Sequence, residues 1–258
     1  MCETCGCSGP VDPHNHNDNT AHDHAHDHEH SHDHDHDHGA RRIDVGADVM
    51  QRNDEFARRN RALFDERGIY AVNLISSPGS GKTTLLERLA DRFGEHMAVV
   101  EGDVQTDRDA ERVIRAGSRA YQIRTNGACH LDAHSVRHAL SHLDLDGVRL
   151  LVIENVGNLV CPAAYELGEH EKAAILSLPE GDDKILKYPA VFHRINVLLI
   201  NKIDLAPHLE FDAARAVNEC RSLNRVFESF RVSGKTGEGL DRYCRYLADK
   251  AGLPHPEA

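Results

Sequence analysis

The chain has 258 residues and a formal net charge of -12, and most of that charge lies at the amino end. Residues 1–40 hold nine of the 42 acidic residues and no Lys or Arg, so the rest of the chain is nearly neutral. A near-neutral body with an acidic tail argues against nucleic acid as the main partner. No apolar run approaches the roughly 18–20 residues of a membrane span and no secretion signal precedes the body, so we expect a cytoplasmic protein.

The first 40 residues are predicted to be a disordered, metal-binding tail. They contain no aromatic residue, and they cannot bury enough apolar surface to offset the entropy cost of ordering. Cys2, Cys5 and Cys7 place three thiols within the first seven residues. If Met1 is removed, the α-amine of Cys2 adds a fourth ligand, and a tetragonal arrangement favours Ni(II). A redox Cys-x-x-Cys is the alternative, but redox pairs lie on a folded strand–helix unit.

The tail also carries eleven of the 20 histidines. From His22 to His38 every second residue is His, with Asp, Ala, Glu or Ser between. Imidazoles at this spacing on a flexible chain bind Ni(II), Cu(II) or Zn(II) weakly, and the carboxylates raise the local cation concentration. The alternation with Asp behind a cysteine motif is unlike a purification tag. The expected weak-storage ligands are His22, His24, His26, His28, His30, His32, His34, His36 and His38.

Residues 41–258 are predicted to form one domain in which strands and helices alternate. An amphipathic helix is expected over Val45–Arg67. Apolar runs predict strands at Tyr70–Ile75, Met97–Val100, Leu150–Ile153, Ala173–Leu178, Val197–Ile200 and Val226–Val232. Helical spacing predicts helices at Thr83–Phe93, Asp109–Ala116, Ala133–Leu143, Phe211–Leu223 and Gly239–Ala251. Buried strands between helices indicate an α/β fold with a mostly parallel sheet flanked by helices.

The first predicted strand leads into a phosphate-binding loop. Ser76–Thr84 reads Ser-Ser-Pro-Gly-Ser-Gly-Lys-Thr-Thr and stands between a strand and a helix, where this motif belongs. Lys82 is expected to reach the β and γ phosphates, and the Thr83 hydroxyl to ligate Mg²⁺. Ser76 replaces the usual first glycine. The predicted phosphate-side contacts are Gly79, Ser80, Gly81, Lys82, Thr83 and Thr84.

A second motif, Asn201-Lys202-Ile203-Asp204, follows a strand and predicts guanine as the base. The Asp204 carboxylate can accept hydrogen bonds from guanine N1–H and its 2-amino group, whereas ATP would leave this buried carboxylate unpaired. Ser233-Gly234-Lys235 resembles the loop that closes over the base in such proteins. The nucleotide is therefore predicted to be GTP, with base-side contacts at Asn201, Lys202, Asp204, Ser233, Gly234 and Lys235.

Two strand ends are predicted to respond to the γ-phosphate. Asp103 is expected to hold Mg²⁺ directly or through water, and Glu154 to hold a metal-bound water. A solvated carboxylate at a strand end is the alternative for Glu154. The backbone amide of Gly157 is expected to contact the γ-phosphate. Lys82, Asp103 and Glu154 are thus the predicted catalytic residues of a GTPase with slow intrinsic turnover.

A second metal site is predicted within the body. Cys129 and His130 are adjacent, but two ligands are too few for a closed site. Cys161 lies three residues beyond Asn158 in the loop that follows Glu154, and it supplies a third ligand. Two symmetric subunits would supply twice that number, which favours a site at a dimer interface.

Other Cys and His residues in helical patterns are interpreted differently. Cys220 and Cys244 are expected to be core residues. His134, His138 and His142 fall on one helical face at spacings of four and could bind metal, although a solvated face is the more common outcome.

Together these motifs resemble the HypB family, the nickel-incorporation GTPases of [NiFe]-hydrogenase maturation. The resemblance covers residues 1–7 and about 45–252, including Cys129-His130-Leu131-Asp132 and Glu154–Cys161. It implies a P-loop GTPase of the SIMIBI class that dimerises around bound nucleotide. It also implies a tight nickel site at the amino-terminal cysteines and a weaker nickel or zinc site at Cys129, His130 and Cys161.

The resemblance further implies two partners, a HypA-like nickel and zinc accessory protein and the hydrogenase large-subunit precursor. The urease-accessory GTPase is a related alternative, but its Cys-Pro-His motif is Cys161-Pro162-Ala163 here. A nickel storage protein with a regulatory nucleotide site is another alternative, and the intact nucleotide motifs argue against it. The guanine motif likewise argues against an ATP-dependent kinase.

Overall fold

The computed structural model describes the chain from Val45 to residue 256, apart from residues 104–107 and the side chains of residues 45–47 and 103–109. Residues 1–40, which were predicted to be disordered, lie outside the described residues. They include the predicted tail ligands Cys2, Cys5, Cys7 and His22 to His38. Gly46–Ala258 forms one compact unit. No helix in the described part of the chain is long and apolar enough to cross a membrane.

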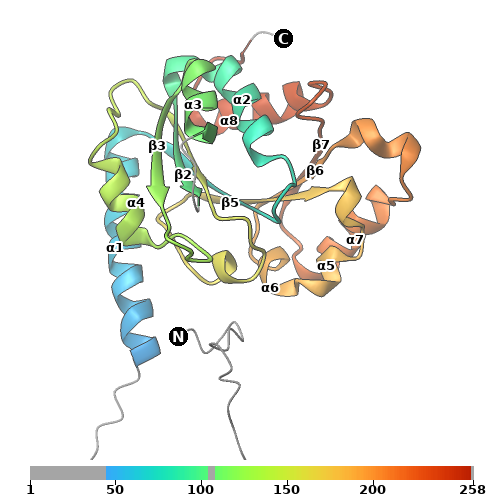
Figure 1. Ribbon diagram of the computed structural model, residues 1–258, viewed down its shortest axis with the longest axis horizontal. Coiled ribbons are helices and arrows are strands. Elements are labelled where there is room, and N and C mark those ends of the chain that lie inside the picture. The colour runs from blue at the N-terminus through green and yellow to red at the C-terminus, as the bar shows by residue number, and fades with distance from the viewer. Residues whose placement is uncertain (1–44, 104–107, 257–258) are drawn as a thin grey trace, which may run out of the picture. The chain divides into compact units, whose positions relative to one another are not determined.

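A single parallel sheet organises this unit. Its seven strands run in the order β3-β2-β4-β1-β5-β6-β7 (Figure 1). Every neighbouring pair is parallel, and β1 lies at the centre between β4 and β5. The strands are β1 Tyr70–Ser76, β2 Met97–Asp103, β3 Arg119–Arg124, β4 Leu150–Glu154, β5 Glu171–Ser177, β6 Val197–Asn201 and β7 Glu228–Arg231. The predicted α/β fold is confirmed.

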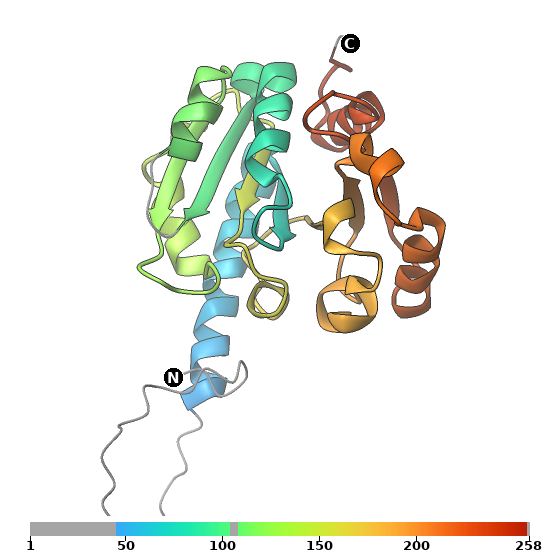
Figure 2. The same ribbon diagram turned by 45° about the vertical axis from the view of Figure 1, so that its right-hand side comes forward.

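Helices cover both faces of the sheet. They are α1 Val45–Arg67, α2 Lys82–Phe93, α3 Arg108–Arg115, α4 Ala133–Leu140, α5 Lys184–Lys187, α6 Pro189–Phe192, α7 Ala213–Leu223 and α8 Leu240–Ala251. Short 3-10 helices lie at η1 Gly94–His96, η2 Cys161–Ala163, η3 Leu178–Glu180 and η4 Ile203–His208. The amino-terminal turns of α1, blue in both views, extend beyond the sheet (Figure 2).

The alternation of side chains along β1 explains the two layers. Val72 and Leu74 pack with α2, α3 and α8 in one hydrophobic cluster. Ala71 belongs to a second cluster with α1 and α4, and Ile75 to a third with α5, α6 and α7. Successive side chains of a strand point to opposite faces, so a continuous apolar strand supplies both layers at once.

The edge strand β3 was missed by the sequence prediction. Its residues read Arg-Ala-Tyr-Gln-Ile-Arg and are half-buried or exposed throughout. β3 pairs on one side only, with β2. An edge strand with one neighbour needs no continuous apolar run, and charged ends protect such an edge from further pairing. The smaller differences are helix and strand ends, such as α4 ending at Leu140 rather than Leu143.

Cys220 and Cys244 are core residues, as predicted. They lie in α7 and α8, and both are buried. Burial raises the pKa of the Cys220 thiol to about 12 and that of Cys244 to about 11. Both therefore stay protonated at neutral pH, which keeps them from acting as nucleophiles or metal ligands.

Glu171 is a buried carboxyl group at the end of the sheet opposite the phosphate loop. The hydroxyls of Tyr70 and Tyr246 donate to its Oε2 at 2.9 and 2.6 Å. Its Oε1 has no hydrogen-bond partner among the described residues. Burial raises the pKa of Glu171 above 4.5, and the hydrogen bonds from Tyr246 and Tyr70 oppose that shift. The carboxyl group therefore takes up a proton more readily in the folded state than in the unfolded chain.

We expect the Glu171→Gln variant to gain stability over the wild type as the pH rises. Because the folded-state pKa is raised, the contribution of Glu171 to stability is complete below its unfolded pKa and is lost as the pH rises through the folded pKa. The amide keeps the shape and an acceptor for both tyrosines. Urea unfolding between about pH 4 and 8 measures the difference in unfolding free energy. A difference in unfolding free energy that stays constant across this pH range would contradict the prediction. The matched control is Glu228→Gln, which replaces an exposed carboxylate at the start of β7.

Candidate nucleotide site and the adjoining metal centre

The phosphate loop joins β1 to α2, and its backbone requires glycine. Gly79 and Gly81 have positive φ angles of 73° and 96°. A Cβ at Gly81 would lie 2.7 Å from Asn201 Nδ2, so no larger residue fits there. Ser76 is buried, and its Oγ accepts hydrogen bonds from Ser80 Oγ at 2.6 Å and Lys82 Nζ at 2.9 Å. The hydroxyl that replaces the usual first glycine thus orients the loop lysine.

A cavity of about 540 Å³ opens over this loop. This volume is in the range of small-molecule binding sites. The cavity brings together most of the predicted phosphate-side residues. Among its lining residues are Gly79, Gly81, Lys82, Thr83, Thr84, Glu154, Gly157 and Lys202. Ser80 does not line it, because its side chain is buried against Ser76.

Glu101 lines the same cavity and was not assigned a role from the sequence. It is only 1 % exposed and pairs in register with Glu154 on the neighbouring strand β4. Two carboxylates and the Thr83 hydroxyl therefore border one cavity, and hard oxygen donors of this kind fit Mg²⁺. Asp103 ends β2 two residues later, but its side chain lies outside the described residues. An acidic residue two positions before Asp103 in the strand was the signal that could have revealed Glu101.

Arg112 of α3 is a second lining residue that the sequence did not reveal. Its guanidinium donates to both carboxylate oxygens of Glu87 in α2, each at 2.7 Å. This fork arrangement fixes the orientation of the guanidinium. It brings a positive charge to the phosphate side of the site.

A smaller cavity of about 200 Å³ adjoins the base-side motif and shares Gly81, Thr84 and Lys202 with the larger one. Its lining also includes Asn201, Asp204, Gly234 and Lys235. Ser233 is buried and does not line it; the Ser233 Oγ donates to Asp204 Oδ1 at 2.6 Å. Ser233 therefore orients the carboxylate that was predicted to recognise guanine.

The base-side and phosphate-side loops are joined by direct hydrogen bonds. Asn201 Nδ2 donates to the Ser80 carbonyl at 2.8 Å, and Lys202 Nζ donates to the Gly79 carbonyl at 2.6 Å. The amide of Gly234 donates to Asn201 Oδ1 at 3.2 Å. Asn201 and Lys202 thus connect the two loops.

The three residues predicted as body metal ligands lie together. The ligand atoms of Cys129, His130 and Cys161 are all within 4.8 Å of one another. Cys129 Sγ is 3.4 Å from His130 Nδ1, and the His130 ring stacks on Tyr165 with centroids 3.9 Å apart. Burial lowers the pKa of His130, which favours the neutral imidazole that binds metal. Three such ligands leave one position of a tetrahedral site open.

Asn155 connects this candidate metal centre to the phosphate cavity. It directly follows Glu154 and is fully buried. Its Oδ1 accepts from the backbone amides of Leu131 at 3.1 Å and Val156 at 3.0 Å. Its Nδ2 donates to Asn73 Oδ1 at 3.2 Å. Because Leu131 follows His130 in the chain, a side chain of the loop that begins at Glu154 contacts the metal-ligand loop directly.

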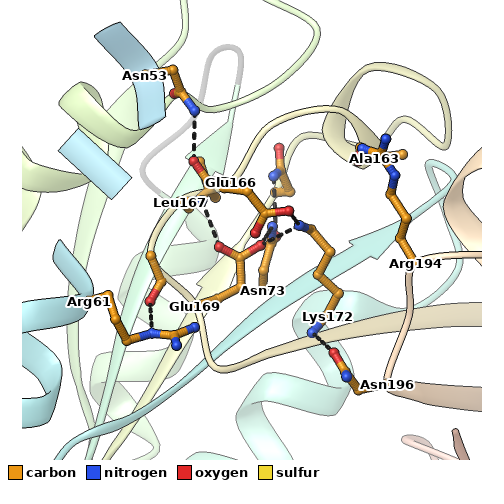
Figure 3. A network of polar contacts seen from close by, with 12 residues as sticks. Asn53, Arg61, Asn73, Ala163, Glu166, Leu167, Glu169, Lys172, Arg194 and Asn196 are labelled. Carbon is orange, nitrogen blue, oxygen red and sulfur yellow. Dashed lines mark hydrogen bonds and ion pairs between the residues drawn. The ribbon is translucent and has the colours of Figure 1, made fainter. Parts of the chain in front are cut away.

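A buried polar network lies behind Asn155. Asn73 Nδ2 donates to Glu169 Oε1 at 3.0 Å, and Glu169 Oε2 accepts from the Leu167 amide at 2.6 Å. Lys172 forms ion pairs with Glu169 at 3.1 Å and with Glu166. Figure 3 shows Glu169 between Asn73, Leu167 and Lys172. Breaking a satisfied buried network leaves unpaired polar groups, so these contacts hold Asn73 and Asn155 in one position.

Helix α1 belongs to the same network. Asn53 Nδ2 donates to the Glu166 carbonyl at 2.8 Å (Figure 3), and Asn53 Oδ1 accepts from the Ala133 amide at 2.9 Å. Asn60 Nδ2 donates to the carbonyls of Ala133 and Leu167, each at 2.9 Å. Two asparagines of α1 therefore hold the start of α4, just after the metal-ligand loop, through its backbone amide and carbonyl groups.

A phosphate loop on the central strand of a parallel sheet and a base-side loop after β6 define a P-loop nucleotide-binding protein. The profile of the family described as "CobW/HypB/UreG, nucleotide-binding domain" matches residues 70–230. The hydrogenase maturation factor HypB of Azotobacter vinelandii is 49% identical over 216 residues, which cover 83% of this chain and 71% of that protein. Its Escherichia coli counterpart is 46% identical, covering 80% and 72%. This chain belongs to the HypB family.

Solved structures agree with this assignment. The structure of HypB from Helicobacter pylori in complex with nickel has a TM-score of 0.74 and 39% identity, covering 80% of this chain and 98% of that one. HypB from Archaeoglobus fulgidus has a TM-score of 0.72 and 36% identity, covering 78% and 99%. The predicted family resemblance is confirmed.

Proposed function

We propose that this protein is a GTP-hydrolysing nickel metallochaperone of the cytoplasm that inserts nickel into the large-subunit precursor of a [NiFe] hydrogenase. Two kinds of support are independent of the site: curated relatives are named hydrogenase maturation factors, and a structural relative was solved with nickel. The observation that carries the proposal is that Asn155, which lines the phosphate cavity, accepts a hydrogen bond from the backbone of the metal-ligand loop.

The nucleotide in this proposal is GTP, which is hydrolysed to GDP and phosphate. The Asp204 carboxylate, oriented by Ser233, receives the N1–H and 2-amino group of guanine. Lys82 and the glycine amides of the loop bind the phosphates. The oxygen donors proposed for Mg²⁺ are the side chains of Thr83, Glu101 and Glu154. The carboxylate of Asp103 is expected to join them. When bound, Mg²⁺ neutralises negative charge on the β and γ phosphates.

Hydrolysis is coupled to nickel through the loop that begins at Glu154. A γ-phosphate held by the Gly157 amide fixes this loop, and Asn155 carries that position to Leu131 and so to Cys129 and His130. Cys161 lies further along the same loop. Loss of the γ-phosphate releases the loop and changes the spacing of the three ligands, which lets nickel leave.

The remaining parts of the chain fit a delivery role. The amino-terminal Cys2, Cys5 and Cys7 would form the tight nickel site, and the histidines from His22 to His38 would store nickel. Thiolate and imidazole ligands also suit zinc, so the body site would accept either ion. A GTP-dependent homodimer would complete its coordination, and a HypA-like nickel and zinc protein is the expected partner.

The test compares the nickel affinity of the body site in two nucleotide states. The full-length protein is titrated at buffered concentrations of free Ni(II), and thiolate–nickel absorption is recorded. The part of this absorption that is lost in the Cys161→Ser variant reports on the body site alone. We expect at least a roughly fivefold difference in affinity between GDP and a non-hydrolysable GTP analogue, the lower end of typical coupling between sites. Asn155→Ala keeps all three ligands and should bring the ratio near one.

The matched control is Asn158→Ala. Among the described residues, Asn158 Oδ1 accepts only from the nearby Val160 amide within the same loop, so the ratio should persist in that variant. Equal affinities in the two nucleotide states of the wild type would contradict the coupling. An unchanged ratio in a folded Asn155→Ala variant would contradict the role of Asn155. Thermal melting of each variant establishes that it is folded.

A further inference from the structure

Two histidines on the surface of the body have converging ring nitrogens. His138 lies in α4 and His142 in the turn that continues it, and both are exposed. Their Nε2 atoms are 3.4 Å apart, and their ring centroids are 4.7 Å apart. Residues four apart on a helix face the same side, which brings the two rings together.

This separation fits a shared metal ion. Imidazole nitrogens bind Zn²⁺ at about 2.0–2.1 Å, so two of them at a tetrahedral angle lie roughly 3.3–3.4 Å apart. The observed 3.4 Å falls at that value. A square or octahedral ion such as Ni(II) brings its ligands closer, to about 2.9 Å for bonds of the same length. Exposed side chains can make this small adjustment.

The surroundings orient the pair. The ring of His142 stacks almost parallel on Tyr121 of β3, with an interplanar angle of 9° and centroids 5.3 Å apart. This contact limits the rotation of the imidazole and presents its Nε2 to His138. His134, one turn earlier on α4, packs instead against the edge of Phe56 with centroids 4.7 Å apart. Of the three histidines with helical spacing, the structure therefore pairs only two.

We infer that His138 and His142 form a second metal site of the body, an exposed two-imidazole site for a divalent transition ion such as Ni(II), Cu(II) or Zn(II). Neutral imidazole nitrogens suit these ions, and water fills the remaining coordination positions. With two protein ligands, the site binds weakly and exchanges readily. It lies on the helix that begins just after the metal-ligand loop, roughly 10 Å along the helix axis from its first residue.

The experiment uses the full-length protein with GDP and with free Ni(II) or Zn(II) held by a competing chelator. Acylation of each histidine by diethylpyrocarbonate is followed by peptide mass spectrometry, so ions bound to the tail do not obscure the result. We expect His138 and His142 to lose reactivity together, at one metal concentration and by at least about tenfold at saturation. In His138→Gln, the midpoint for His142 should rise at least about tenfold.

His134→Gln is the matched control on the same helix, and it should leave the protection of both residues unchanged. The inference is overturned if His138 and His142 stay reactive at metal concentrations far above those that protect the tail, or if His142 is protected equally well in His138→Gln. Either result leaves the proposed function intact, because the measurement does not involve GTP hydrolysis or the Cys129, His130 and Cys161 centre.

Discussion

The Lys82→Ala variant is expected to hydrolyse GTP about 10²–10³-fold more slowly than the wild type, the usual cost of removing a preorganised group that stabilises transition-state charge. Lys82 Nζ is held 2.9 Å from Ser76 Oγ at the floor of the phosphate cavity, where it meets the β and γ phosphates of the proposed substrate. Single-turnover phosphate release at saturating GTP measures the effect.

Nickel binding should survive this substitution, because Lys82 is not a ligand in any of the proposed metal sites. Lys82→Arg keeps the charge but changes its geometry, so its rate should fall between those of the wild type and the alanine variant. Loss of nickel binding together with hydrolysis would contradict the division into a nucleotide site and separate metal sites. An unchanged hydrolysis rate would contradict the role given to Lys82.

The Asp204→Asn variant is expected to lose its preference for GTP. Guanine donates two hydrogen bonds to the carboxylate, and hydrogen bonds to charged groups are worth about 1.5–3 kcal/mol each. The affinity for GTP should therefore fall roughly 10²–10⁴-fold, and that for xanthosine triphosphate should rise. Xanthine carries an oxygen where guanine carries its amino group, and the asparagine amide can donate to it. Competition with a fluorescent guanine nucleotide measures both affinities.

Ser233→Ala is the control for this prediction. It removes only the hydroxyl that donates to Asp204 Oδ1 at 2.6 Å, so the affinity for GTP should fall by less and xanthosine triphosphate should gain nothing. Guanine recognition at this position would be contradicted if Asp204→Asn bound GTP as tightly as the wild type does and showed no gain in affinity for xanthosine triphosphate.

Most of the residues that line the cavities could be predicted because they stand at strand ends, although Glu101 and Arg112 were missed. The carboxyl ends of parallel strands meet along one edge of the sheet, so Lys82 after β1, Glu154 at the end of β4 and Asp204 after β6 had to lie near one another. Order along the chain and strand length were sufficient for this. Cys161 was proposed as a third ligand from its position in the loop after Glu154, and about thirty residues separate it from His130, so the family resemblance was the stronger support for placing the two together.

The polar network behind the site could not be predicted, because its members share no motif. Asn73 is a single polar residue in an apolar strand, and nothing in the sequence says that it pairs with Asn155 and Glu169. Such contacts depend on the register of neighbouring strands, which sequence spacing alone does not determine. In the same way, the pairing of Glu101 with Glu154 follows from the alignment of β2 with β4.

The hydrogen bonds of Asn201 and Lys202 to the phosphate loop have a consequence for how the proposed GTPase would distinguish GTP from GDP. The loop expected to receive the α and β phosphates is held in place by the loop expected to receive the base. Binding either nucleotide there costs little reorganisation, so this wall of the cavity contributes nearly equal affinity to both. In this proposal, discrimination between the two would come from the loop that begins at Glu154 and includes Gly157. Binding of a nucleotide and detection of its γ-phosphate would then be separate tasks, and only the second would belong to the loop that leads to Cys161.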